Sequence, residues 1–417
     1  MKKPIHFPFL ISVFGGVFLW FLIFLIFPAK VVYPFSNEAF GFIFISYCSL
    51  ILGYFVPLKF LNNKEGNSTK FSKSFICIII CISIISFIIR YIDLFCYRKI
   101  SFSNGVWLNR ELLTKTKPMI IFIIASVFKQ FYFIPLILIL KEKIKDNKLI
   151  ILTSMLFLFP FIEGFIRGSR NMFFIPIILL FVILLFFKKI RFKKKHIIFS
   201  LSITVILFTI ATSIIMSREA DKTDYNYSTL TTNSYLNEFL KPNPGVFKKI
   251  HSIENQPIKK SLVSGFQISQ YYVHGVFEFD NLVKFYKNKP HKLTLGKYTF
   301  FTLNRFTNKY GITNTDLEKI QLLHPRGYTF ITFFGGLFLD FGWYGVIIMF
   351  LYGMFQRYSY NQILINKNEF LPLFIFLLFV NFFMLTFNYL RGLGIYIILV
   401  CFLLIFVINF NKKIIFK

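Results

Sequence analysis

Arginine precedes glycine three times in this chain, each time just before a long hydrophobic segment, at Arg167-Gly168, Arg326-Gly327 and Arg391-Gly392. The N-terminus of a helix carries unpaired N–H groups and about half a positive charge. A neighbouring guanidinium adds a planar fork that can bind two oxygens of a phosphate. About one such pair is expected by chance at average glycine usage. The three pairs therefore predict anion binding, if these helix starts face the same side of a membrane.

Hydrophobic segments of membrane-spanning length recur along the whole chain, which is 56% hydrophobic and 20% aromatic. A helix needs ~20 apolar residues to cross the hydrocarbon core of a bilayer. The pattern predicts an all-α integral membrane protein with about ten transmembrane helices. The predicted spans are 8–27, 39–61, 74–95, 118–140, 149–165, 172–187, 196–216, 328–355, 370–390 and 393–410.

Lysine-rich connections predict which side of the membrane each span end faces. Residues 59–73, 141–148 and 188–195 are dense in lysine, as are both termini. The positive-inside rule places such short loops in the cytoplasm. Alternation of the spans then puts residues 217–326 outside, since a loop of that length crosses largely regardless of its charge. We therefore expect both termini to be cytoplasmic.

This topology divides the chain into three parts. Residues 1–216 hold seven spans, residues 217–326 form one large folded outer loop, and residues 327–417 hold three more spans. The segment 328–355 is longer than one span requires, and glycines stand within it at positions 335, 336, 342 and 345. We expect a broken or re-entrant helix there, which is tolerated where the backbone lines a cavity.

Under this topology the lysines divide almost evenly between the two sides, but the arginines do not. Only Arg191 and Arg357 fall on the inside. The others are outside or near the outer end of a span: Arg90, Arg98, Arg110, Arg167, Arg170, Arg218, Arg305, Arg326 and Arg391. Arginine keeps its charge in any environment and recognises phosphate through two parallel hydrogen bonds. The outer face is thus predicted to hold an anion, although a single boundary arginine can equally well reach a lipid headgroup.

Two groups of charged residues stand at predicted outer span ends. Glu163, Arg167 and Arg170 lie between two spans joined by almost no loop, and Arg90 and Asp93 are one helical turn apart. Spacings of three and four residues predict local ion pairs. Charges at membrane depth are also functional by default, because exposing them to lipid is costly. Both interpretations stay open.

Acid–base candidates occur next to these arginines. His324 is the one histidine beside an Arg-Gly pair, and its neutral imidazole can accept a proton from a sugar hydroxyl, although a lone histidine is more often structural. Asp340 is either a base or the cap of a helix break. The loop carboxylates Asp280 and Glu278 are alternative bases.

The outer loop contains a helix-like stretch, 261–286, that carries Tyr271 and Tyr272. Tyrosines can stack on sugar rings, although they are more often core or interface anchors. The chain lacks metal-ligand spacings, a P-loop and a G-x-G-x-x-G motif, so we expect no metal and no cofactor. Its net charge of +30 does not indicate nucleic acid, because the basic loops alternate with lipid-length spans.

Taken together, these residues resemble the O-antigen polymerases of the Wzy type. The similarity lies in Arg90-x-x-Asp93 at the end of the third span, in Gly168-Ser169-Arg170, and in the long outer loop that runs into Thr329 and Asp340-Phe341-Gly342-x-x-Gly345. The resemblance implies a glycosyltransferase of the bacterial inner membrane. Its substrates would be oligosaccharide repeat units on undecaprenyl pyrophosphate, polymerised at the periplasmic face, and a chain-length regulator is a candidate partner.

The resemblance also implies roles for individual residues. The pyrophosphate would be bound by Arg90, Arg167, Arg170, Arg326 and Arg391. The catalytic candidates are His324, Asp340 and Glu163. The glycan-binding candidates are Tyr271, Tyr272 and Asp280.

Three other classes of membrane protein are alternatives. An O-antigen ligase would carry Asn, Ser or Gln after its histidine, where this chain has His324-Pro325. A flippase for lipid-linked oligosaccharides would have short loops and a cavity reached from both sides. A carrier would have paired repeats and mid-membrane charges, whereas the spans here offer little besides Lys129.

Overall fold

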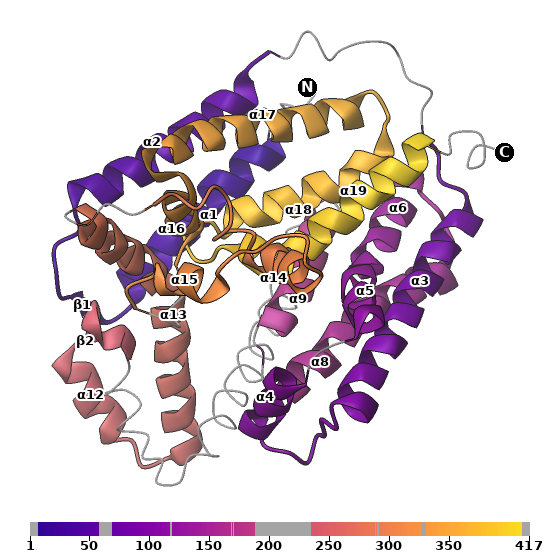
Figure 1. Ribbon diagram of the computed structural model, residues 1–417. Helices are drawn as coiled ribbons and strands as arrows, with labels where there is room; N and C mark the ends of the chain where they lie inside the picture. Colours follow the sequence, from indigo (N-terminus) through magenta and orange to yellow (C-terminus); the bar gives the residue numbers. More distant parts are fainter. Residues whose placement is uncertain are drawn as a thin grey trace.

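The computed structural model describes residues 7–57, 69–116, 119–167, 169, 171–187, 235–287, 289, 292–326 and 331–410. Regular structure in these residues is almost entirely helical (Figure 1). The helices are α1 (Phe7–Ile26), α2 (Asn37–Phe55), α3 (Lys73–Ile92), α4 (Val106–Lys115), α5 (Ile120–Phe128), α6 (Ile134–Glu142), α7 (Asn147–Met155), α8 (Phe159–Arg167), α9 (Asn171–Phe186), α12 (Pro244–His251), α13 (Gln256–Lys287), α14 (Phe301–Lys309), α15 (Leu317–Leu322), α16 (Phe333–Phe341), α17 (Gly345–Leu364), α18 (Leu371–Phe382) and α19 (Gly394–Phe410). Two short strands, β1 (Ala29–Val31) and β2 (Leu240–Pro242), pair antiparallel.

Six helical segments of the described chain are long and apolar enough to cross a membrane. They are Phe7–Ile26, Asn37–Phe55, Lys73–Tyr97, Ile120–Glu142, Asn147–Arg167 and Phe333–Leu364. Three shorter apolar helices, Met172–Phe186, Asn368–Phe382 and Gly394–Phe410, overlap further predicted spans, although the predicted span 370–390 is α-helical only to Phe382. The all-α membrane architecture is thus confirmed, while the count of ten spans stays a prediction. The predicted span 196–216 lies outside the described residues.

Prolines divide two of these spans into two α-helices each. Pro135 stands at the start of α6 and Pro160 at the start of α8. Proline has no backbone N–H and its ring displaces the preceding turn, so an α-helix cannot continue through it undisturbed. A 3₁₀ turn precedes each proline, η3 (Lys129–Phe133) in one span and η4 (Leu156–Leu158) in the other. The break at η3 places a lysine inside the bundle.

The long segment Phe333–Leu364 is also broken, between α16 and α17. Gly342 ends α16 with a φ of 55°, in the left-handed region that favours glycine, and a 3₁₀ turn (Gly342–Tyr344) leads into α17. The break leaves Asp340 fully buried at the end of α16. Asp340, which lies within a predicted membrane span, can therefore accept hydrogen bonds from the loop residues that pack against it.

The centre of the bundle is α18, which is buried from Leu371 to Asn381 and lies among α1, α17 and α19 (Figure 1). The Asn381 amide exchanges hydrogen bonds with Gln356 at 2.7 and 3.1 Å and donates to the Ser12 hydroxyl at 3.2 Å. Buried amides need such partners. This polar contact fixes the register of α1, α17 and α18 in an otherwise apolar interior.

Helices α2 and α17 touch backbone to backbone along their length (Figure 1). A Cβ atom at Gly53 would lie 2.0 Å from the Phe350 carbonyl oxygen, and one at Gly353 would lie 2.2 Å from the Leu50 carbonyl oxygen. Small residues permit this approach in membrane helices, where packing replaces the hydrophobic effect as the driving force. The α2–α17 pair is therefore specified by two glycines.

One end of the bundle is tied together by polar contacts between the predicted cytoplasmic connections. The Asn368 backbone N–H donates to the Thr69 hydroxyl at 2.7 Å, and the Asn368 amide donates to the Thr69 carbonyl at 2.8 Å and to Glu142 at 3.4 Å. Lys73 pairs with Asp146 at 3.3 Å. We call this end the lysine side. The segments that meet there are the ones that alternation predicts to share a side.

The opposite end, which we call the loop side, carries α4 and the outer-loop helices α13–α15 (Figure 1). The helix expected over 261–286 is α13, which packs against α1 and α2. Asp280 accepts a hydrogen bond from the Ser36 backbone N–H at 2.9 Å and another from its hydroxyl, and the Phe24 and Phe277 rings are 5.8 Å apart. Strand pairing between β1 and β2 adds a third connection. The described part of the large loop is thus folded onto the helix ends.

Replacing Gly353 with valine should separate α2 from α17, because the new Cβ would overlap the Leu50 carbonyl. We expect a loss of at least about 1–3 kcal/mol of stability. The measurement is the thermal unfolding temperature of the purified protein. Gly41→Val is the matched control, since nothing lies within 4 Å of a Cβ at that position on α2. Equal unfolding temperatures for the two variants would contradict this account of the pair.

Candidate functional site

A buried carboxylate on the loop side gathers three cations. Glu163, on α8, is 1% exposed. Its Oε1 accepts hydrogen bonds from Arg90 Nη2 at 2.9 Å and from Arg167 Nη1 at 2.8 Å. Its Oε2 pairs with Lys129, which the η3 turn places 4% exposed inside the bundle. Both oxygens are engaged, so Glu163 acts in this geometry as the shared counterion of three helices.

Arg90 extends this group to a second buried carboxylate. It pairs with Asp93, one turn further along the same helix, and Asp93 Oδ1 also lies 2.9 Å from Arg98 Nε. The Arg98 guanidinium in turn donates to the carbonyls of Leu113 and Thr116 at 2.8 and 3.0 Å. The π-helical turn Asp93–Tyr97 brings Arg98 back toward Asp93. Both local pairs expected from spacing are present, and Arg90 joins them into one network.

This network, which we call the arginine cluster, carries an excess of positive charge. Arg90, Arg98, Lys129 and Arg167 face only Asp93 and Glu163, so two positive charges are left unbalanced among the described residues. Arg167 is the member nearest to solvent, with a third of its side chain exposed. Uncompensated buried charge is costly unless a counterion is supplied. The arginine cluster is therefore suited to a dianionic ligand that approaches Arg167.

A second group of candidate residues centres on Arg326. Its guanidinium lies 3.1 Å from Glu278 Oε1 and 3.2 Å from Glu238 Oε2, and 4.7 Å from the centre of the Phe239 ring. Glu278 is fully buried, whereas Glu238 is more than half exposed. Burial raises the pKa of Glu278 to about 7, with Arg326 opposing and Glu238 adding to the shift. Glu278 thus changes charge near neutral pH.

His324 lies between Arg326 and Arg391. Its Nδ1 is 2.6 Å from the Arg326 carbonyl oxygen, which can only accept, so Nδ1 carries the proton and Nε2 is the acceptor nitrogen. Burial lowers the pKa of His324 to about 4, and the charges of Arg391 and Arg326 contribute in the same direction. The imidazole is therefore neutral at physiological pH, as a proton acceptor must be. At that pKa it is a weak base.

Asp340 positions Arg391 rather than facing it. Its carboxylate accepts hydrogen bonds from the Thr294 hydroxyl at 2.5 Å and from the backbone N–H groups of Tyr298 and Thr299 at 2.8 and 2.9 Å. Tyr298 is fully buried, and Arg391 stacks on its ring at 3.8 Å and donates to its hydroxyl. The geometry gives Asp340 a role that differs from both the base and the helix-break cap expected from the sequence: it anchors the turn that carries Tyr298.

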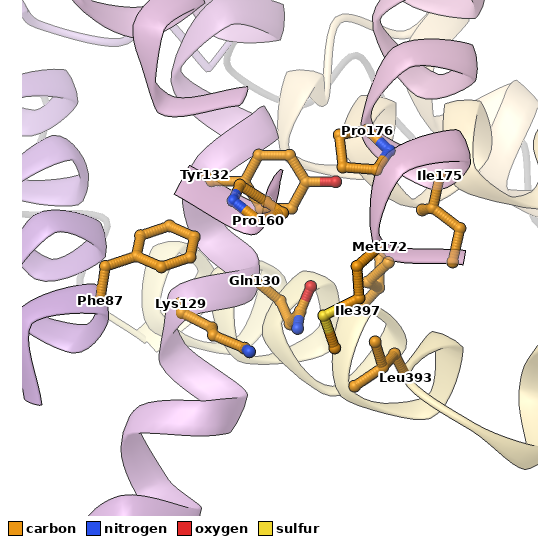
Figure 2. A pocket seen from close by; sticks show the side chains of 10 residues that line it. All are labelled: Phe87, Lys129, Gln130, Tyr132, Pro160, Met172, Ile175, Pro176, Leu393 and Ile397. Carbon is orange, nitrogen blue, oxygen red and sulfur yellow. The ribbon is translucent and has the colours of Figure 1, made fainter. Parts of the chain in front are cut away.

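Helices α14 and α19 connect the arginine cluster with the residues around Arg326 and Arg391. Tyr396, near the start of α19, is within electrostatic range of both Arg305 and Arg90. Arg305 belongs to α14, whose Thr302 hydroxyl donates to the Arg391 carbonyl at 2.7 Å. A small cavity with room for about one water molecule lies between η3, α9 and the start of α19. Figure 2 shows Lys129 and Gln130 on one wall of that cavity, with Met172, Leu393 and Ile397 on the other.

The helix starts that follow the three Arg-Gly pairs differ from one another. Helix α9 begins four residues after Arg167, and α19 begins three residues after Arg391, with Met172 and Leu393 lining the same cavity. After Arg326 the next described helix is α16, and its N-terminus is capped by Thr332, whose hydroxyl accepts from the Gly335 N–H at 3.1 Å. Two of the predicted starts therefore converge at this cavity, whereas Arg326 precedes a helix that Thr332 caps.

The remaining predicted site residues lie in different surroundings. Arg170 lies outside the described residues. The Tyr271 ring packs 5.4 Å from Phe387, and Tyr272 lies close to Tyr47 of α2, so both tyrosines face the bundle under the loop. Asp280 lies on the other face of α13 and binds Ser36 and Lys284. From the sequence, Arg98 was only one of the outer arginines and had no assigned role, and the one clue to Lys129 was a lysine inside an apolar span.

The chain matches no protein-family model, no curated protein and no solved structure. Among the described residues, no group of three or more His, Cys, Asp or Glu side chains is arranged as metal ligands. The conclusions about this site therefore depend on its own geometry.

Replacing Glu163 with glutamine should destabilise the protein by about 3–5 kcal/mol, because the buried cations Arg90 and Lys129 lose the counterion that they share with the partly exposed Arg167. Adding Lys129→Met to Glu163→Gln should restore part of that loss by removing one of the cations. Thermal unfolding of the purified variants measures both effects. Glu111→Gln is the control, since the exposed Glu111–Lys115 pair contributes about 1 kcal/mol or less. A double variant less stable than Glu163→Gln would refute the proposed charge balance.

Proposed function

We propose that this protein is a membrane glycosyltransferase that polymerises oligosaccharide repeat units carried on a lipid pyrophosphate, such as undecaprenyl pyrophosphate. The observation that carries the proposal is the arginine cluster, with its two unbalanced positive charges. A pyrophosphate monoester or diester attached to a lipid has the complementary charge and arrives from the membrane. The resemblance to Wzy-type O-antigen polymerases, read from the sequence, supports the same assignment.

The proposed reaction moves a glycan chain from its lipid carrier to the terminal sugar of an incoming lipid-linked unit. The acceptor hydroxyl oxygen forms a bond to the anomeric carbon of the donor glycan. The bond between that carbon and the pyrophosphate oxygen breaks, and its electron pair leaves with the pyrophosphate. The hydroxyl proton passes to a basic side chain. Arginines that hold the leaving group stabilise the charge that develops on it.

Arg167 and Arg391 are the arginines best placed for that role. Arg167 is the partly exposed member of the arginine cluster, and Arg391 is held on Tyr298 beside the shared cavity wall at Leu393. Arg90 and Arg98 lie deeper and are engaged by carboxylates. We infer that Arg90 and Arg98 maintain the positive electrostatic potential of the site. Arg167 and Arg391 would contact the phosphates. Arg326 and Arg170 are further candidates from the sequence.

Two side chains are candidates for the base. His324 is held in the acceptor tautomer between two arginines, but its pKa near 4 makes it weak. Glu278 has a pKa near 7, which is well matched to proton transfer at neutral pH, and it pairs with Arg326. The two candidates predict different pH profiles.

The site is expected to face the periplasm of a bacterial cell, with the lysine side in the cytoplasm. This orientation follows from the positive-inside rule. A lipid-linked oligosaccharide flippase is the runner-up, because it would also need cationic groups. A folded outer loop packed over the helix ends favours a polymerase, since a flippase requires a path through the bundle.

Deleting the gene should leave single repeat units on the surface lipid, and the intact gene should restore long chains. Arg391→Ala and Arg391→Lys should both fail to restore them, since an ammonium cannot reproduce the planar fork. Gel electrophoresis of the surface polysaccharide gives the chain lengths. Arg357→Lys, on the lysine side at Tyr54, is the matched control and should restore long chains. Normal chain lengths with Arg391→Ala, or no repeat unit at all in the deletion strain, would overturn the proposal.

The pH dependence of kcat/KM should identify the base. If Glu278 must be ionised, kcat/KM falls about tenfold per pH unit below pH 7, because the carboxyl is protonated there. If His324 is the base, the fall begins only near pH 4. Arg326 and Glu238 are the charged groups that face Glu278, so Glu238→Gln should shift a Glu278-dependent limb to lower pH. A limb near pH 7 that survives Glu278→Gln would exclude Glu278.

A further inference from the structure

A groove on the loop side shares Glu238 and Phe239 with the group around Arg326 and is lined by the candidate Asp280. It encloses about 370 Å³, within the ~300–1,000 Å³ range of small-molecule sites. Its walls come from three separate segments: the connection between α1 and α2, the turn before β2, and α13. The lining residues are Tyr33, Pro34, Glu238, Phe239, Phe277, Asp280, Asn281 and Lys284.

The groove is built on a fixed framework. Asp280 accepts hydrogen bonds from the Ser36 backbone N–H and hydroxyl, and Lys284 bridges the Asp280 carboxylate at 2.6 Å and the Pro34 carbonyl at 2.8 Å. These bonds attach the α1–α2 connection to α13. On the opposite side, the Arg326 guanidinium holds both Glu238 and the Phe239 ring. The groove is thus pre-formed.

The lining combines an exposed aromatic ring with hydrogen-bonding groups. Tyr33 is 55% exposed, and its ring meets Phe239 edge to face at 6.5 Å. The Asn281 side chain makes no hydrogen bond within the described residues, and the Glu238 carboxylate is more than half exposed. An aromatic face for the C–H groups of a ring, with an amide and a carboxylate for its hydroxyls, suits a saccharide.

The charge of the lining narrows the class of sugar. Two carboxylates, Glu238 and Asp280, face one ammonium, Lys284. This balance disfavours an acidic sugar or a phosphate, which the arginine cluster suits instead. The anionic and the sugar parts of one substrate would thus bind at separate places on the loop side. Arg326 connects them, since it pairs with Glu238 and its carbonyl binds His324.

We propose that this groove binds a neutral or amino sugar of the acceptor chain, with Tyr33 as the stacking platform and Asn281 and Glu238 as hydroxyl partners. The assignment to an acceptor rests on the proposed polymerase function. A saccharide seated beside Glu238 would have its free end directed by the Glu238–Arg326–His324 contacts toward the arginines that hold the leaving group.

The test uses the full-length protein in lipid nanodiscs, free of glycoside detergent. The probe is the soluble repeat-unit oligosaccharide released by mild acid from the lipid carrier of the deletion strain, with binding followed by saturation-transfer NMR and titration. Tyr33→Ala should raise the Kd about tenfold, and Asn281→Leu should raise it also. Tyr344→Ala is the matched control, because this tyrosine is 68% exposed and lies outside the groove.

A reconstituted assay with labelled lipid-linked units separates this proposal from the proposed function. If both hold, Tyr33→Ala raises the KM for the acceptor and leaves kcat nearly unchanged. If long chains form but Tyr33→Ala and Tyr344→Ala bind the oligosaccharide with equal Kd, the groove proposal is overturned and the function stands. If binding depends on Tyr33 but no chain forms, the function is overturned and the groove stands. Lipid retained in the groove in place of the oligosaccharide would also overturn the groove proposal.

Discussion

The Glu163 carboxylate is the interaction on which the arrangement of the loop side depends. A charge in a low-dielectric interior must be paired, and here one carboxylate serves cations from three helical segments. Because Arg90, Lys129 and Arg167 all require it, α3, η3 and α8 have a common meeting point. The single negative charge of Glu163 cannot neutralise these three positive charges, even though Arg90 also pairs with Asp93. The same pairing that orders these helices therefore leaves a site with a net positive charge.

Interrupted helices make this arrangement possible. A continuous α-helix through residues 120–142 would carry Lys129 in a regular turn, whereas the 3₁₀ turn before Pro135 turns it into the bundle. The π-helical turn after Asp93 directs Arg98 back to that carboxylate in the same way. At α16 the break at Gly342 leaves Asp340 to bind the turn that holds Tyr298 and, through it, Arg391. In these three cases the irregularity lies at or next to a charged group that has a partner.

The folded loop adds a second kind of chemistry to the same end of the molecule. Helix α13 presents Tyr271 and Tyr272 to the bundle and Asp280 to a groove, so its two faces have different roles. Arg326 stands between this groove and the arginines, with a carboxylate on either side. Such a division suits a substrate with a sugar end and a phosphate end. It also accounts for a large loop rich in both aromatic and charged residues.

Sequence alone determined the parts that follow from length and local spacing. Hydrophobic length predicted the spans that the structure describes, and three- and four-residue spacing predicted the Arg90–Asp93 and Glu163–Arg167 pairs. Glycines marked the break before α17. Only the tertiary structure decided that Arg90 joins the two pairs and that Lys129 shares Glu163. These two contacts connect residues 73 and 34 positions apart, so they depend on how the helices pack, which no local pattern encodes.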